Sequence, residues 1–171
     1  RKAFLQVDSA LEICCLPMAD GGEGTVDAFL SALGGERKTV RVHGPLFAMH
    51  NASFGILKDG TAILEMAAAA GLPLAGKDAN PMYTTTFGVG ELIRAALDAG
   101  CRKIRVGAGG SATTDGGIGC LTALGARFTD KTGEEVPPMG CGLSRVACIN
   151  LDGLDERLRE ADVTVLCDVK S

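Results

Sequence analysis

The sequence predicts an α/β protein, because apolar strands alternate with helices and glycine-rich loops along most of the chain. The order strand, glycine loop, helix occurs at residues 13–33 and again at 103–124. A third observation is the turn Lys58-Asp59-Gly60 between two apolar runs, which is typical of a hairpin. The pattern therefore indicates parallel strands with crossover helices, interrupted by a section of three consecutive strands.

The individual elements follow from hydrophobic spacing and from glycine, proline and threonine signals. The predicted helices are residues 1–11, 26–33, 67–70, 91–99, 118–124 and 154–161. The predicted strands are residues 13–18, 39–42, 50–57, 61–66, 103–106, 126–128 and 163–167. Gly34-Gly35 and Gly100 follow helices at the position where glycine commonly ends them, and the threonines at 84–86 offer N-caps.

The composition is that of an ordinary globular protein, with 46% hydrophobic and 22% charged residues. The net charge is −4 and the basic residues are scattered, which argues against nucleic acid or an anionic membrane as the main partner. The longest apolar stretch, residues 62–74, contains Glu65, Gly71 and Pro73, so we expect no membrane span. Seven cysteines without a C-x-x-C pair indicate free thiols in a reducing, cytoplasmic compartment.

The pattern of expected elements changes near residues 36–40, where three consecutive strands replace the alternation of strands and helices. We expect residues 1–38 to belong to one lobe and residues 39–171 to a second α/β lobe that includes the hairpin. The chain lacks an initiator Met, begins within a predicted helix and stops just after a predicted strand. We therefore expect it to be an internal piece of a longer protein, with both lobes incomplete.

Three acidic residues, Asp20, Asp115 and Asp168, each lie at or beyond the end of an apolar strand. Ligands of open α/β sheets bind outside the carboxyl ends of the strands, so these side chains could face one cleft. Backbone N–H groups in the two glycine-rich loops, near helix N-termini, are suited to phosphate. Carboxylates beside them could hold magnesium or accept a proton from an attacking hydroxyl, as phosphoryl transfer requires.

Two other interpretations of these loops remain open. Glycines after strands often only form turns, and an Asp there often only caps a helix. Alternatively, Gly107, Gly109 and Ala112 fit the dinucleotide pattern G-x-G-x-x-A, with Asp130 near the spacing of a ribose-binding acid, which would indicate an NAD(P)-binding Rossmann domain. Against this, Asp115 would lie close to the pyrophosphate. Walker-type G-x-x-x-x-G-K-[ST] does not occur.

Five motifs stand in order along the chain: residues 20–25 (DGGEGT), 65–72, 85–93, 107–117 and 167–169. Together they resemble the bacterial type I glycerate kinase family, and the resemblance covers nearly the whole chain. Two positions depart from the family pattern. Phe47 stands where Gly is usual, and Thr114 stands where Asn is common.

The resemblance implies two α/β domains with the active site between them, and residues 1–38 are expected to be part of the Rossmann-like one. It implies transfer of a phosphoryl group from ATP, with Mg²⁺, to D-glycerate. The expected product is 2-phosphoglycerate, with 3-phosphoglycerate as the alternative.

The candidate site residues fall into two groups. Those expected to bind phosphate or substrate are Asp20, Gly21, Gly22, Glu23, Gly107, Gly109, Gly110, Ser111 and Thr113. Those expected to act in catalysis and to bind the metal are Asp115 and Asp168, and the residues do not indicate which carboxylate is the base. Glu65 is a further possible ligand, although a lone Glu at a strand end is more often solvated or salt-bridged.

Overall fold

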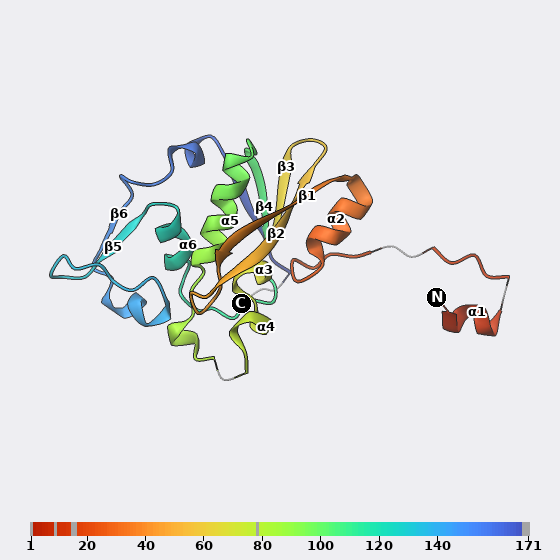
Figure 1. The fold of residues 1–171 in the computed structure, drawn as a ribbon, viewed down its shortest axis with the longest axis horizontal. Coiled ribbons are helices and arrows are strands. Elements are labelled where there is room, and N and C mark those ends of the chain that lie inside the picture. Colours follow the sequence, from red (N-terminus) through yellow and green to blue (C-terminus); the bar gives the residue numbers. More distant parts are fainter. Residues whose placement is uncertain (1, 9, 15–16, 78, 169–171) are drawn as a thin grey trace.

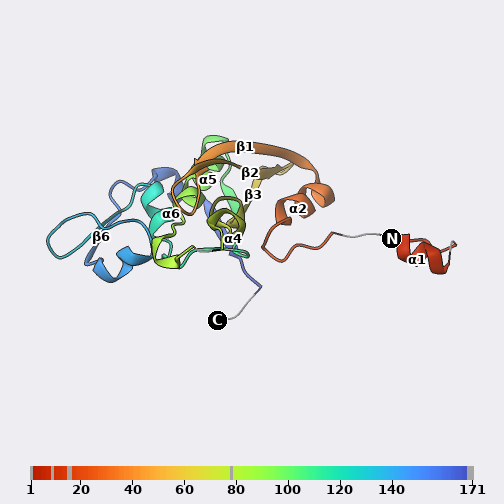
Figure 2. The same ribbon diagram turned by 60° about the horizontal axis from the view of Figure 1, so that its bottom comes forward.

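The computed structural model describes residues 2–8, 10–14, 17–77 and 79–168. A five-stranded sheet with the order β1-β2-β3-β4-β7 forms its centre. Helix α2 packs against one face of this sheet and helix α5 against the other (Figures 1 and 2). The protein is therefore a three-layer α/β structure, as the alternation of elements predicts.

Most of the expected elements are present, although β1 and α5 begin four residues earlier than expected and β6 was not expected. The strands of the main sheet are β1 (Gly35–His43), β2 (Met49–Leu57), β3 (Thr61–Glu65), β4 (Lys103–Gly107) and β7 (Asp162–Leu166). A small second sheet contains β5 (Arg127–Thr129) and β6 (Cys148–Asn150). The α-helices are α1 (Lys2–Val7), α2 (Thr25–Leu33), α3 (Ala67–Ala70), α4 (Leu72–Ala75), α5 (Phe87–Asp98) and α6 (Ile118–Ala123), and the 3-10 helices are η1 (Pro81–Tyr83), η2 (Gly140–Arg145) and η3 (Glu156–Arg159).

The main sheet is mixed. Strands β1, β2 and β3 pair in antiparallel order, whereas β3, β4 and β7 are parallel. The parallel strands end in one row, in which Glu65 pairs with Gly107 and Gly107 with Leu166. This row matters because ligands of α/β sheets bind beyond the carboxyl ends of parallel strands.

Strand β3 shows how the sequence builds two cores. Its alternate residues Ala62 and Leu64 pack toward α5, while Ile63 packs toward α2 with Val26. Side chains alternate between the faces of a strand, so a strand buried on both faces is apolar throughout. Leu64 and Ile63 are 0% and 1% exposed, and burial of such a side chain contributes about 1.5–3 kcal/mol.

Two expectations are corrected by the structure. Residues 13–14 and 17–18 form no strand, and Met18 is 89% exposed. A strand needs a neighbour for its backbone N–H and C=O groups, and among the described residues this run pairs with neither edge of the sheet. The helix expected at 154–161 is only the short 3-10 helix η3, which follows an Asp155 cap.

The expected lobe boundary between residues 38 and 39 falls inside β1, and α2 packs on the same sheet as β2 and β3. The division into two lobes stays a prediction. Helix α1 lies apart from the rest of the molecule, and its Val7 is 87% exposed (Figure 1). Within the described ranges, each helix is too short or too polar to span a bilayer.

Candidate functional site

The two glycine-rich loops meet at the carboxyl ends of β4 and β7. The N–H of Ala108, just after β4, donates to the carbonyl of Leu166 at the end of β7 (3.0 Å). The N–H of Gly109 donates to the carbonyl of Gly21 in the first loop (3.0 Å). Segments almost ninety residues apart in the chain are thereby joined backbone to backbone, beside the end of the parallel strands.

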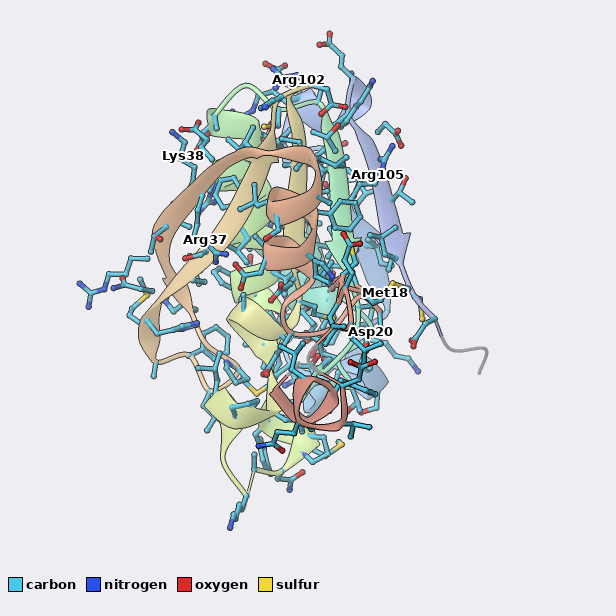
Figure 3. The ribbon with its side chains drawn as sticks, turned by 90° about the vertical axis from the view of Figure 1, so that its right-hand side faces the viewer. Met18, Asp20, Arg37, Lys38, Arg102 and Arg105 are labelled. Atoms are coloured by element: carbon cyan, nitrogen blue, oxygen red, sulfur yellow. The ribbon has the colours of Figure 1, made fainter. Side chains whose placement is uncertain are left out.

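A pocket of about 310 Å³ opens next to this junction, between α2 and the end of β7. Its lining includes Asp20, Gly21 and Asp168, together with Thr25 and Phe29 of α2. Both carboxylates are on exposed residues, and Figure 3 shows Asp20 beside the end of β7. The structure thus brings together two of the three acids that the sequence places at strand ends.

The direction of Asp20 is set within its own loop. One carboxylate oxygen accepts the N–H of Gly22 (2.9 Å), a local bond typical of Asp in turns. Glycine is needed at Gly21, where φ is +88° and a Cβ would lie 2.8 Å from the carbonyl oxygen of Leu166. The carbonyl at the end of β7 thus leaves no room for a side chain at Gly21.

Most amides of the first loop already have internal acceptors. The N–H of Gly21 donates to Thr25 Oγ1 (3.1 Å), and that of Gly22 to Asp20. In the second loop the amide of Gly109 is also in use, whereas within the described residues those of Gly110 and Ser111 donate to no acceptor. Phosphate binding by these loops stays a prediction, and the amides of Gly110 and Ser111 are among those available for it.

Glu65, at the end of β3, occupies the helix terminus where the sequence places an anion. Its Oε1 accepts the N–H of Val26 in the first turn of α2 (2.6 Å). Burial raises the pKa of this carboxyl, and hydrogen bonds from the amides of Val26 and Gly24 oppose the rise. The sequence gives little sign of this role, because Glu65 and Val26 are separated by 39 positions in the sequence. Glu23 lies nearby, lining with Glu65 a separate pocket of about 280 Å³.

Asp115 lies apart from the other two acids and is 1% exposed. Its Oδ2 accepts the N–H and the hydroxyl of Thr86 (both 2.8 Å) and the N–H of Gly119 (3.1 Å). Its Oδ1 accepts the N–H of Gly117 (3.0 Å). The carboxylate therefore joins the starts of α5 and α6, and it does not line the pocket of Asp20 and Asp168.

The remaining polar candidates of the second loop lie between these two regions. The hydroxyls of Ser111 and Thr113 are 2.7 Å apart, and Ser111 also accepts the N–H of Thr113 (3.1 Å). Ser111 forms an isolated β-bridge with Gly71, between α3 and α4. The loop therefore crosses the surface from the pocket to the buried Asp115, and its residues do not share one environment.

The dinucleotide interpretation does not fit this geometry. A fingerprint glycine loop leads directly into a helix, whereas α6 begins only at Ile118, after eleven described residues (107–117) of strand end, turn and coil. Asp130 follows β5, which belongs to the small sheet and pairs with β6. It binds Arg145 and Thr132, so it is not beside a nucleotide loop.

A metal at the Asp20–Asp168 pocket would have two carboxylate ligands from this chain. Among the described residues no group of three or more His, Cys, Asp or Glu side chains could hold an ion. Magnesium is commonly bound by one or two carboxylates, with phosphate oxygens and water completing its octahedron. The pocket fits that pattern.

Comparison with known proteins gives a consistent answer. The glycerate kinase family model matches residues 1–171. The chain is 52% identical over 170 residues to the glycerate kinase of Bacillus subtilis (strain 168) and 45% identical over 170 residues to the glycerate 2-kinase of Escherichia coli (strain K12). These matches cover 98% of this chain but only 44% and 45% of the relatives, so the chain spans less than half of their length.

The fold comparison agrees. The crystal structure of the Salmonella typhimurium LT2 protein named glycerate kinase 2 superposes with a TM-score of 0.85 at 45% sequence identity. The match covers 98% of this chain and 46% of that one. On the family match over all 171 residues and these identities, the chain belongs to the glycerate kinase family.

Proposed function

We propose that the protein containing this chain transfers the γ-phosphate of ATP to a hydroxyl of D-glycerate, with Mg²⁺. The observation that carries the proposal is the pocket shared by Asp20 and Asp168 at the ends of the parallel strands, beside two glycine-rich turns. The relatives named glycerate kinase support the same activity. Phosphoryl transfer depends mainly on positioning and on charge neutralisation, both of which such a pocket provides.

In this proposal Asp20 and Asp168 hold the magnesium ion, and one of them accepts a hydrogen bond from the attacking hydroxyl. When bound, the ion would neutralise charge on the phosphate oxygens. The Gly22 N–H keeps one oxygen of Asp20 directed, while Asp168 extends from the end of β7. Asp115 was expected in the same role. Its burial and its four internal hydrogen bonds favour a supporting role instead.

The carboxylate of glycerate needs a cation, and among the described residues neither Arg105 nor Arg94 is placed to supply it. Arg105 pairs with Asp162 (2.8 Å) and lies along the sheet, away from Asp20 in Figure 3. Arg94 donates to the carbonyl of Ala123 (3.0 Å) on the α5 side. We propose that the cation comes from a part of the full-length protein outside this chain, and that the 171 residues alone are inactive.

The product is proposed to be 2-phosphoglycerate, and the E. coli relative named glycerate 2-kinase supports this. The test is to incubate the full-length protein with ATP, Mg²⁺ and D-glycerate and to identify the product by phosphorus NMR. We expect a resonance of 2-phosphoglycerate, and a 3-phosphoglycerate resonance would correct the regiochemistry. If neither product forms and NADH binds in a fluorescence titration, the kinase assignment is contradicted.

A further inference from the structure

The contact between the two glycine loops suggests a role for Gly109 that differs from binding phosphate. The amide of Gly109 already donates to Gly21, so it is not available to a ligand. The absence of a side chain is the more informative property. A Cβ on Gly109 would lie 2.8 Å from both the Cα and the N atom of Gly22.

The N atom of Gly22 is the donor that directs Asp20. The contacts therefore form a short chain, from Gly109 to the Gly22 amide and from that amide to the Asp20 carboxylate in the pocket. Close approach of two backbones is a standard reason for glycine at such a position. Because Gly109 packs against the backbone of Gly22, and the Gly22 amide donates to the Asp20 side chain, displacement of one moves the next.

We propose that Gly109 is a positioning residue, which holds the Gly22 amide where it directs Asp20 toward Asp168. This inference rests on the proposed function for the identity of the bound ion and substrate. It assigns different roles to different residues of the second loop. Gly109 acts by packing, whereas Gly110 and Ser111 provide the free amides.

A side chain at Gly109 has a predictable consequence. Contacts of 2.8 Å between carbon and backbone atoms are not tolerated, so the first loop must move away, and Asp20 moves with it. A misplacement of about 1 Å in an active site can lower turnover about 100-fold. We expect Gly109→Ala in the full-length protein to lower kcat by about that factor, with a smaller change in the KM of glycerate.

A double-mutant cycle separates positioning from a structural role. If Gly109 acts through Asp20, then Gly109→Ala lowers kcat less than about twofold when Asp20→Asn is already present, because contacting residues are not additive. Independent, multiplying effects of the two substitutions would overturn the proposal. So would a kcat for Gly109→Ala within about twofold of the wild type.

Two further variants keep the test informative if Gly109→Ala folds poorly. A Cβ on Gly22 would meet Asp20 Oδ1 at 3.2 Å, so Gly22→Ala should show the same masking by Asp20→Asn with a smaller effect. Gly133→Ala is a control for backbone strain without a steric clash, because its Cβ meets nothing within 4 Å and its φ of +86° is unfavourable for alanine, whereas Gly109 and Gly22 have no such positive φ. It should lose some stability and keep its kcat. Additive effects for Gly22→Ala as well would reject the proposal.

Metal binding provides a readout that does not depend on glycerate. Residues that orient metal ligands typically change metal affinity 10- to 100-fold, so Gly109→Ala should weaken Mn²⁺ binding about 10-fold in an electron paramagnetic resonance titration. If the wild type binds Mn²⁺ but does not phosphorylate glycerate, the proposed function fails while this inference stands. Unchanged Mn²⁺ affinity in Gly109→Ala would overturn the inference alone.

Discussion

The surroundings of Asp115 and the pocket of Asp20 and Asp168 contain the same kind of residue in opposite environments. Asp115 is 1% exposed and accepts four hydrogen bonds from the starts of two helices. Asp168 lies on the exposed side of a pocket at the end of β7. A buried carboxylate is stable only when its oxygens are fully hydrogen-bonded, whereas a carboxylate that binds ligands must keep oxygens available. This difference in burial is the reason for our proposal that the first region contributes to stability and the second to the chemistry.

The sharpest way to break this comparison is Asp168→Asn in the full-length protein. We expect kcat to fall about 10²–10³-fold, because a neutral amide stabilises the metal and the transferring phosphoryl group less well than a carboxylate does. The midpoint of thermal unfolding should change little, since Asp168 is exposed. Steady-state kinetics and calorimetry on the same samples measure both. Near-normal turnover would show that Asp168 has no direct role in catalysis.

The reciprocal change is Asp115→Asn. An amide group would turn a donor toward the N–H groups of Gly117 or Gly119, and loss of charge-assisted bonds at a buried site should cost about 3 kcal/mol of unfolding free energy. Urea denaturation measures this loss. The folded fraction should retain most of its kcat. A stable protein with strongly reduced kcat would instead support the direct catalytic role that the sequence suggests for Asp115.

Thr86→Val sharpens the comparison within the buried region. The hydroxyl of Thr86 donates to Asp115 and accepts the N–H of Cys120 (2.9 Å), so valine keeps the shape and removes both bonds. We expect a loss of about 1–3 kcal/mol, smaller than or comparable to that of Asp115→Asn. Combined with Asp115→Asn, the two losses should be less than additive. Full additivity in urea denaturation would mean that they do not act as one unit.

Glu65 is less buried than Asp115 and less exposed than Asp168. Its titration predicts how the unfolding free energy depends on pH. Burial raises its folded pKa above 4.5, so the charged form costs stability in the folded state. This cost is absent below the unfolded pKa and grows as pH rises through the folded pKa. Glu65→Gln keeps an acceptor for Val26 N–H but does not titrate. The unfolding free energy of the wild type relative to this variant should therefore decrease as pH rises above 4.5. A flat difference between pH 4 and 7 would contradict it.

The smallest effect is expected at Phe47, which lies outside both regions. Its φ of +61° is unfavourable for a residue with a side chain, by about 1–2 kcal/mol. Its ring contacts those of His43 and Phe87, with centroids 5.9 and 5.8 Å away, and such pairs contribute about 0.5–1.5 kcal/mol each. Phe47→Gly should therefore change the unfolding free energy by less than about 1 kcal/mol and leave kcat unchanged. A large loss of kcat would show that this turn reaches the site.

Much of the fold could be predicted locally. The hairpin at Lys58-Asp59-Gly60, the strand at 103–107 and the helix after Gly117 all agree with the sequence pattern, because turn residues and hydrophobic spacing act over a few residues. The segment 13–18 was predicted as a strand and forms none in its described residues. Hydrophobicity indicates that a run can be buried, but a strand also needs a partner, which only the assembled sheet can supply.

The sequence by itself determined the α/β class, the family resemblance and the set of acidic and glycine residues from which a site could be built. Tertiary structure decided which acids share a pocket. Asp115 is buried because Thr86, 29 residues earlier, meets it at the start of α5, and Glu65 caps α2 across 39 residues. Hydrogen bonds between distant segments depend on how the sheet and helices pack, and local sequence carries no record of that packing.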